Sequence, residues 1–102
     1  MKIDAKIQNN TIYIMLSGEL DEYTSHYTRT YLDDTFESNN YESVIFDMQN
    51  LEFMDSTGIG VLLGRYKKLK SKNKSAYILN SNKSIDKILT MSGIYEIMPK
   101  IS

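Results

Sequence analysis

The sequence contains no cysteine, one histidine and one proline, and its acidic and basic side chains nearly balance. Without cysteine, the chain forms no disulfide, no thiolate metal site and no cysteine nucleophile, which fits a reducing compartment. A formal net charge of −1 gives no electrostatic case for binding nucleic acid. Apolar runs reach only a few residues, so the sequence predicts neither a signal peptide nor insertion into a membrane. We therefore expect a cytoplasmic protein.

Length and composition limit the number of domains. The 102 residues include 41% hydrophobic and 25% charged side chains, enough for one small core and too few for two. We therefore expect a single domain over residues 1–102.

Hydrophobic periodicity predicts the elements of this domain. Two alternating segments meet at Asn9 and Asn10, which indicates a hairpin because asparagine tolerates the positive φ of a two-residue turn. Gly18 is expected to close the second strand. The predicted order is a strand pair near 3–7 and 12–16, a helix within 19–38, a strand at 43–48 covered on both faces, a helix at 56–71, a strand at 75–80, a helix within 82–94 and a last strand at 95–98. This order predicts an α/β domain with a mainly parallel sheet, an N-terminal hairpin and helices packed on the sheet.

The stretch FMDSTGIG at 53–60 places polar residues and glycines where the second helix begins. Asp55 is expected to be the N-cap, with Met54 and Ile59 placed as a hydrophobic staple. Ser56 is then the first helical residue, beyond the carboxyl edge of the sheet, where α/β sheets place their ligands. We expect a surface for close approach of a partner, opposite the apolar stripe of this helix and formed by Thr57, Val61, Gly60 and Gly64.

Enzyme motifs are weak in this sequence. No G-x-x-x-x-G-K-[ST] stretch exists, and Asp-Ser-Thr-Gly lacks the first glycine of a nucleophile elbow. The sole imidazole, His26, is expected at the surface. No acidic pair after the first strand could join Asp47 in a magnesium site, so a loop or capping role is expected for Asp47. Asp33 and Asp34 are expected to be solvated carboxylates. Tyr23, Tyr27 and Tyr31 are expected to cover the flank of the first helix.

Three segments carry a family resemblance. SGELD at 17–21, FMDSTGIGVLLGRYKKLK at 53–70 and MSGIYEI at 91–97 resemble, in order and spacing, the anti-sigma factor antagonists of the STAS domain family. The likeness covers nearly the whole chain, and the middle segment is highly specific. Its LGRY continuation favours the sporulation branch over the general-stress antagonists. Family members commonly end in another helix, whereas this sequence stops soon after its last predicted strand.

The resemblance implies a regulatory switch, not an enzyme, with no cofactor or metal of its own. The unphosphorylated form would bind an anti-sigma factor that is a serine kinase carrying ATP or ADP, and would thereby release the sigma factor, sigma-F in the sporulation branch. Phosphorylation of Ser56 by that kinase would inactivate the protein, and a membrane-associated PP2C-type phosphatase would restore it. The residues expected at the partner interface are Asp21, Asp55, Ser56, Thr57, Gly58, Ile59, Gly60, Val61 and Gly64.

Other functions stay open at this point. A general-stress anti-sigma factor antagonist is the alternative within the same family. A nucleotide- or small-ligand-binding module could hold a phosphate at the N-terminus of the second helix. A hydrolase would need Ser56 as its nucleophile.

Overall fold

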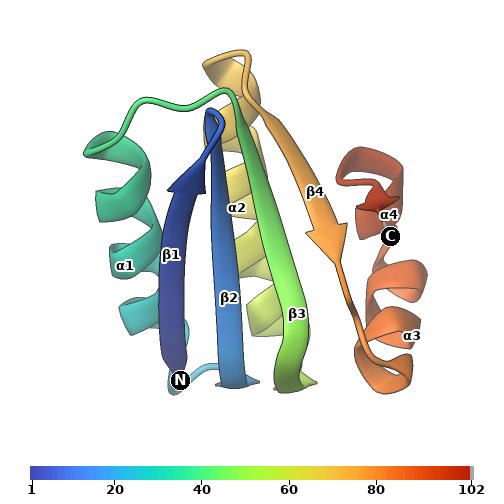
Figure 1. Ribbon diagram of the computed structural model, residues 1–102. Helices are drawn as coiled ribbons and strands as arrows, with labels where there is room; N and C mark the ends of the chain where they lie inside the picture. The colour runs from blue at the N-terminus through green and yellow to red at the C-terminus, as the bar shows by residue number, and fades with distance from the viewer. Residues whose placement is uncertain (102) are drawn as a thin grey trace.

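A computed structural model describes residues 1–101 as a five-stranded sheet in the order β1-β2-β3-β4-β5, with helices packed mainly behind it (Figure 1). Only β1 and β2 pair antiparallel; the other neighbours are parallel. The predicted α/β class and hairpin are confirmed. The elements are β1 (Lys2–Gln8), β2 (Thr11–Leu20), α1 (Ser25–Glu37), β3 (Ser43–Met54), α2 (Ser56–Ser71), β4 (Ser75–Leu79), α3 (Lys83–Ser92), α4 (Ile94–Ile97) and β5 (Lys100–Ile101).

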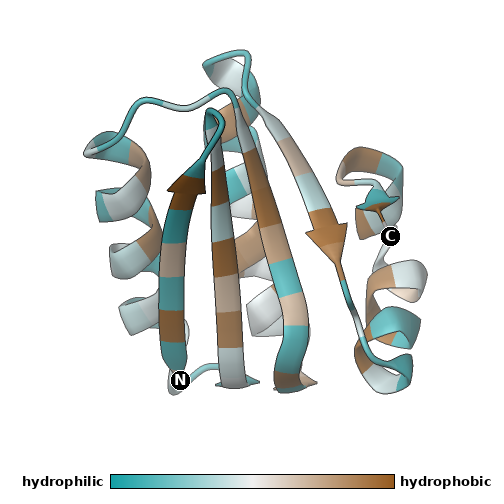
Figure 2. Cartoon of the chain, in the orientation of Figure 1, coloured by the Kyte–Doolittle hydropathy of each residue, from teal (hydrophilic) through white to brown (hydrophobic). Residues whose placement is uncertain are grey.

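The hairpin turn forms as its sequence predicts. Asn9 and Asn10 have φ values of 53° and 64°, and Gln8 pairs with Thr11 across the turn. Along β1, apolar bands alternate with hydrophilic ones (Figure 2). This register places Ile3 against the core and the intervening charged residues on the other face.

Strands β2 and β3 are longer than predicted. Gly18 does not end β2; its φ of +105° lies between two shifts of register with β3, and the strand continues to Leu20. Strand β3 likewise runs on to Met54, so Asp47 lies within a strand and not in a loop. Helix α1 consequently starts only at Ser25. This additional pairing determines where strands β2 and β3 end.

One face of the sheet carries the core. Helices α1 and α2 lie behind β1–β3 (Figure 1) and enclose fully buried residues such as Ile14, Phe46 and Leu62. On the opposite face Tyr13 is exposed and Ile45 half-buried. The prediction that β3 is covered on both faces was wrong, because no helix lies over that side of β1–β3 in the described chain.

Helices α1 and α2 are joined by an ion pair. Arg65 Nε lies 3.1 Å from Asp33 Oδ1, and Lys68 Nζ lies 3.0 Å from Asp33 Oδ2. The Arg65 guanidinium is buried and its Nε–H does not point at the carboxylate, so the contact is electrostatic and not a hydrogen bond. Asp33 is therefore not the solvated residue we expected, whereas Asp34 is exposed.

The end of the chain differs from the prediction. Gly93 adopts φ +80° after α3, and residues 94–97 then form the short helix α4 in place of a strand. Ile94 and Met98 are both fully buried, four residues apart, and Met98 N–H donates to Ile94 O. That spacing suits a helical turn and not a strand, so the predicted strand at 95–98 was wrong.

Hydrogen bonds among polar side chains hold this end of the chain in place. Asp86 Oδ1 accepts from Tyr95 OH at 2.7 Å, Lys100 Nζ at 2.8 Å and Ser81 Oγ at 3.2 Å. The Lys100 and Tyr95 hydrogen bonds lower the pKa of Asp86. Burial, with help from the Asp86 carboxylate, raises the pKa of Tyr95 to about 12.

The raised pKa of Tyr95 predicts a pH dependence. The folded state favours the neutral phenol, so its contribution to stability is complete below the ordinary value of 10.0 and is lost as pH rises through about 12. We expect the difference in free energy of unfolding between the wild type and Tyr95→Phe to shrink over that interval. In a titration followed by phenolate absorbance, the wild type should show a step at about pH 12 that Tyr95→Phe lacks. An unchanged absorbance titration would contradict the assignment.

Candidate functional site

The site is built where β2 and β3 end side by side. Leu20 and Met54, the last residues of the two strands, are register partners. Beyond the strand ends, Asp55 N–H donates to Leu20 O at 3.4 Å. Asp21 and Asp55 therefore follow neighbouring strand ends at the carboxyl edge of the sheet, the lower edge in Figure 1. Tertiary pairing thus brings together two acidic motifs that lie over thirty residues apart in sequence.

Asp55 caps helix α2 as predicted. Its Oδ1 accepts hydrogen bonds from Thr57 N–H at 2.9 Å and Gly58 N–H at 3.1 Å. The cap leaves Ser56 as the first residue of α2, with an exposed side chain at the positive end of the helix dipole. The serine hydroxyl is thus available to another protein while the backbone around it is fixed.

Asp21 organises a similar turn before α1. Its Oδ1 accepts from Tyr23 N–H at 2.9 Å and Thr24 N–H at 3.1 Å, and the Thr24 hydroxyl donates to Glu19 O at 2.8 Å. Each aspartate thus closes its own turn through one carboxylate oxygen, so the two charges on this edge are held by the backbone.

The glycines of α2 divide into two kinds. A Cβ at Gly58 would lie 2.6 Å from Met54 Cγ and 2.7 Å from Leu20 O, whereas at Gly60 or Gly64 it would meet nothing within 4 Å. Gly58 is buried and lets the helix start pack onto the end of β2. Gly60 and Gly64 leave bare backbone facing open space.

Two of the residues expected at the partner interface lie inside the domain. Gly58 is a packing residue, and Val61 is completely buried in the core. The inward face of α2 consists of Gly58, Val61, Leu62, Arg65 and Leu69. The apolar spacing of the sequence instead predicts Ile59, Leu62, Leu63, Tyr66 and Leu69 on that face. Of the remaining expected residues, Ser56 and Gly60 are exposed, and the half-buried ones are Asp21, Asp55, Thr57, Ile59 and Gly64.

Two exposed aromatic residues beside the site were not among those expected at the partner interface. Tyr23, expected to cover a helix flank, precedes α1 and is 88% exposed, and Phe53, one residue before the end of β3, is 45% exposed. Exposed aromatic side chains are enriched at protein interfaces. Their sequence positions could have indicated them, because each aromatic residue lies within two residues of a motif aspartate.

A catalytic centre finds no support at Ser56. Within residues 1–101 the Ser56 hydroxyl has no hydrogen bond to a base, and His26 is an exposed residue of α1. No group of three or more potential metal ligands gathers in that part of the chain.

Known proteins match this architecture. The STAS domain family matches residues 2–102. The chain belongs to the STAS domain family. An anti-sigma F factor antagonist of Paenibacillus polymyxa is 35% identical over 99 residues, covering 97% of this chain and 85% of the relative. An anti-sigma-B factor antagonist of Staphylococcus aureus is 26% identical, covering 96% and 90% respectively.

Solved structures of the anti-sigma factor antagonist SpoIIAA share this STAS fold. The unphosphorylated form superposes with a TM-score of 0.83 at 25% identity, over 99% of this chain and 89% of that one. The phosphorylated form gives 0.74 at 25% identity, over 99% and 92%. This STAS domain is thus an anti-sigma factor antagonist by relationship, a regulatory protein and not an enzyme. Within residues 1–101, no helix is long and apolar enough to cross a membrane.

Proposed function

We propose that this STAS domain is a phosphorylation-controlled antagonist that binds an anti-sigma factor with serine kinase activity and thereby releases a sigma factor. The observation that carries the proposal is the exposed Ser56 hydroxyl at the start of α2, next to the cap Asp55 and at the sheet edge where Asp21 follows the neighbouring strand end. A kinase must take this hydroxyl into its own active site, which requires both exposure and a surface without obstructing side chains. The open backbone of Gly60 and Gly64 meets the second requirement.

The proposed cycle has two states. Unphosphorylated protein binds the anti-sigma factor, which carries ATP or ADP, and phosphorylation of Ser56 ends that binding. A PP2C-type phosphatase removes the phosphate and restores the active form. We place this cycle in the cytoplasm. We take sigma-F as the regulated factor because the antagonist from Paenibacillus polymyxa is the more similar of the two relatives described above.

The test is the intact mass of the protein after incubation with ATP and an anti-sigma F factor. We expect one added phosphoryl group on the wild type and none on Ser56→Ala. Thr30→Ala is the control, because it removes a hydroxyl at an exposed position of α1 and should still be phosphorylated once. Phosphate on Ser56→Ala would assign the acceptor to another residue. Labelling of Ser56 by a serine-directed covalent probe would favour a hydrolase instead.

A general-stress role is the second candidate, supported by the likeness to the Staphylococcus aureus antagonist. Parallel titrations with an anti-sigma F and an anti-sigma-B factor separate the two, since the cognate partner should bind more tightly. Titration with ATP alone tests the remaining alternative, a nucleotide-binding module. Saturable ATP binding at the N-terminus of α2 without a partner would favour that module.

Gly60→Leu is expected to weaken partner binding by about tenfold, a loss of about 1.4 kcal/mol. A side chain at Gly60 projects into open space, so the fold should keep or slightly gain stability, while bulk on the proposed contact face blocks close approach. Binding affinity and thermal melting are the measurements. Thr30→Leu, at an exposed position of α1, is the control and should bind normally. Normal binding by Gly60→Leu would remove this helix face from the interface.

A further inference from the structure

The face of the sheet opposite α1 and α2 carries an organised set of side chains. Among residues 1–101, no helix crosses this face of β1, β2 and β3 (Figure 1). The strand register arranges its outward residues in rows: Asp4 pairs with Met15, which pairs with Asp47, and Lys6 pairs with Tyr13, which pairs with Ile45. Because neighbouring strands lie about 4.8 Å apart, the backbones of Asp4 and Asp47 are about 10 Å apart with Met15 between them.

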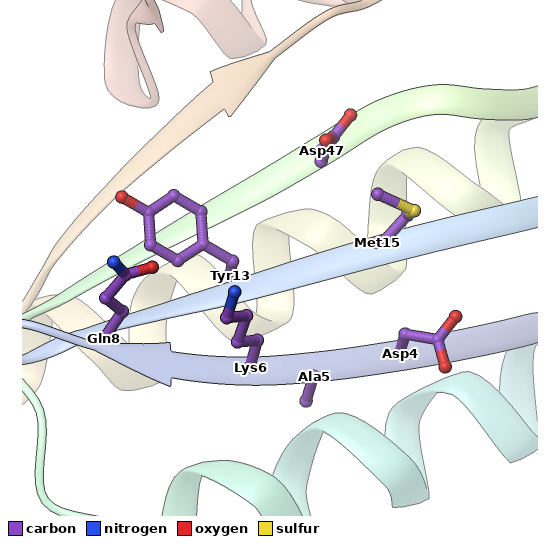
Figure 3. A pocket seen from close by; sticks show the side chains of 7 residues that line it. All are labelled: Asp4, Ala5, Lys6, Gln8, Tyr13, Met15 and Asp47. Atoms are coloured by element: carbon purple, nitrogen blue, oxygen red, sulfur yellow. The ribbon is translucent and has the colours of Figure 1, made fainter.

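These rows border a hollow of about 330 Å³, within the range of small-molecule sites. Figure 3 shows Lys6, Tyr13, Met15 and Asp47 rising from three strands on the same side of the sheet, while Ala5 points away toward α1. The full lining is Asp4, Ala5, Lys6, Gln8, Tyr13, Met15 and Asp47. An aromatic ring and a thioether therefore form the floor, and charged groups stand at the rim.

The charges at the rim favour a cation. Two carboxylates face one ammonium group, and within residues 1–101 neither Asp4 nor Lys6 forms an ion pair. Asp47 uses its Oδ1 to accept from Gln49 N–H at 3.0 Å and Asn80 Nδ2 at 3.4 Å, both neutral donors. Its negative charge is therefore not neutralised by a protein cation.

The apolar floor of the hollow favours a cation that carries a flat, apolar group. The Tyr13 ring is 37% exposed and borders the hollow, and the face of a tyrosine ring attracts cations. Met15 is half-buried in the next row, and methionine adapts its shape to flat apolar partners.

We infer that this hollow is a binding site for small aromatic amines in their cationic form. The ring stacks on Tyr13 and Met15, and the ammonium group lies between the carboxylates of Asp4 and Asp47. The site lies on the opposite side of the sheet from the helix face of Ser56 and Gly60, so the inference does not rest on the proposed function.

Titration of the isotope-labelled protein with three indole compounds of similar size tests the ligand class. Tryptamine is a cation at neutral pH, tryptophol is neutral and indole-3-acetate is an anion. We expect tryptamine to shift the backbone amides of residues 4–6, 13–15 and 45–47 with saturation. Tryptophol should bind about fivefold more weakly, and indole-3-acetate more weakly still. Equal affinity for the anion, absence of saturable shifts, or shifts centred on α2 would overturn the proposal.

Variants test the residues. The double variant Asp4→Asn, Asp47→Asn keeps side-chain size and the oxygen that serves Gln49, and should weaken tryptamine binding about tenfold. Tyr13→Ala should remove most of the remaining affinity. Asp34→Asn, an exposed carboxylate on α1, is the matched control and should bind as the wild type does. Unchanged binding by the double variant, with an intact thermal transition, would refute the role of the carboxylates.

Discussion

Phosphorylation of Ser56 is expected to leave the fold intact and to weaken binding of the anti-sigma factor by about a hundredfold, or about 2.7 kcal/mol. The phosphate adds a charge of about −1.5 to −2 at the exposed start of α2. At the interface it must be desolvated against a surface shaped for a hydroxyl, which readily costs this much.

The domain itself should tolerate the phosphate because opposing effects are comparable. A helix N-terminus favours an anion by roughly 0.3 to 2 kcal/mol. The gain is limited here, since Asp55 already accepts from the N–H groups of Thr57 and Gly58. Repulsion by the Asp55 carboxylate is on the order of 3 kcal/mol for unit charges about 5 Å apart at an effective dielectric near 20, and less where water screens it.

Melting temperature, amide chemical shifts and partner affinity of the two forms are the measurements. Shifts should be confined to the starts of α1 and α2 and the strand ends beside them. Equal affinity of both forms for the kinase would refute the switch. Shift changes across the whole sheet would show that phosphate acts by refolding the domain.

Gly58→Ala is expected to lower the free energy of unfolding by about 2 kcal/mol, although alanine is the better helix former. Its Cβ would lie 2.7 Å from Leu20 O, a backbone atom that cannot rotate away. The start of α2 would have to move off the end of β2, weakening the contact between Asp55 N–H and Leu20 O. We therefore also expect weaker partner binding, because the turn that presents Ser56 is displaced.

Gly60→Ala is the matched control, with the same chemical change two residues further along the helix. Its Cβ meets nothing within 4 Å, so the variant should gain about 0.5 to 1 kcal/mol. Chemical denaturation of the two variants measures the contrast. If Gly58→Ala proves as stable as Gly60→Ala, the close packing of α2 on the end of β2 is not a constraint on this residue.

Local sequence signals predicted several features closely. The Asn9–Asn10 turn, the span of α2 from Ser56 to Ser71 and the cap by Asp55 all follow from residues that are neighbours in the chain. Such features depend on φ preferences, capping hydrogen bonds and helical periodicity, which act over a few residues. The buried residues of α1, which are Ser25, Thr28, Leu32 and Phe36, follow the same helical periodicity.

Features that depend on distant segments could not be read from the chain. Gly18 resembles a strand end, but β3 provides pairing partners that carry β2 on to Leu20. The sequence at 58–61 presents Gly58, Gly60 and Val61 alike as candidates for an interface. Only the position of Leu20 against the start of α2 makes Gly58 a packing residue, and only the packing of that helix into the core buries Val61.

The sequence by itself determined the class of the fold, the position of the exposed serine and the family. Its motifs and periodicities are properties of contiguous residues. Only the tertiary structure decided which residues of α2 face outward, that Asp21 and Asp55 share one edge, and that one face of the sheet lies open. These properties arise because parallel pairing and helix packing join segments thirty or more residues apart, and no local pattern records the geometry of that contact.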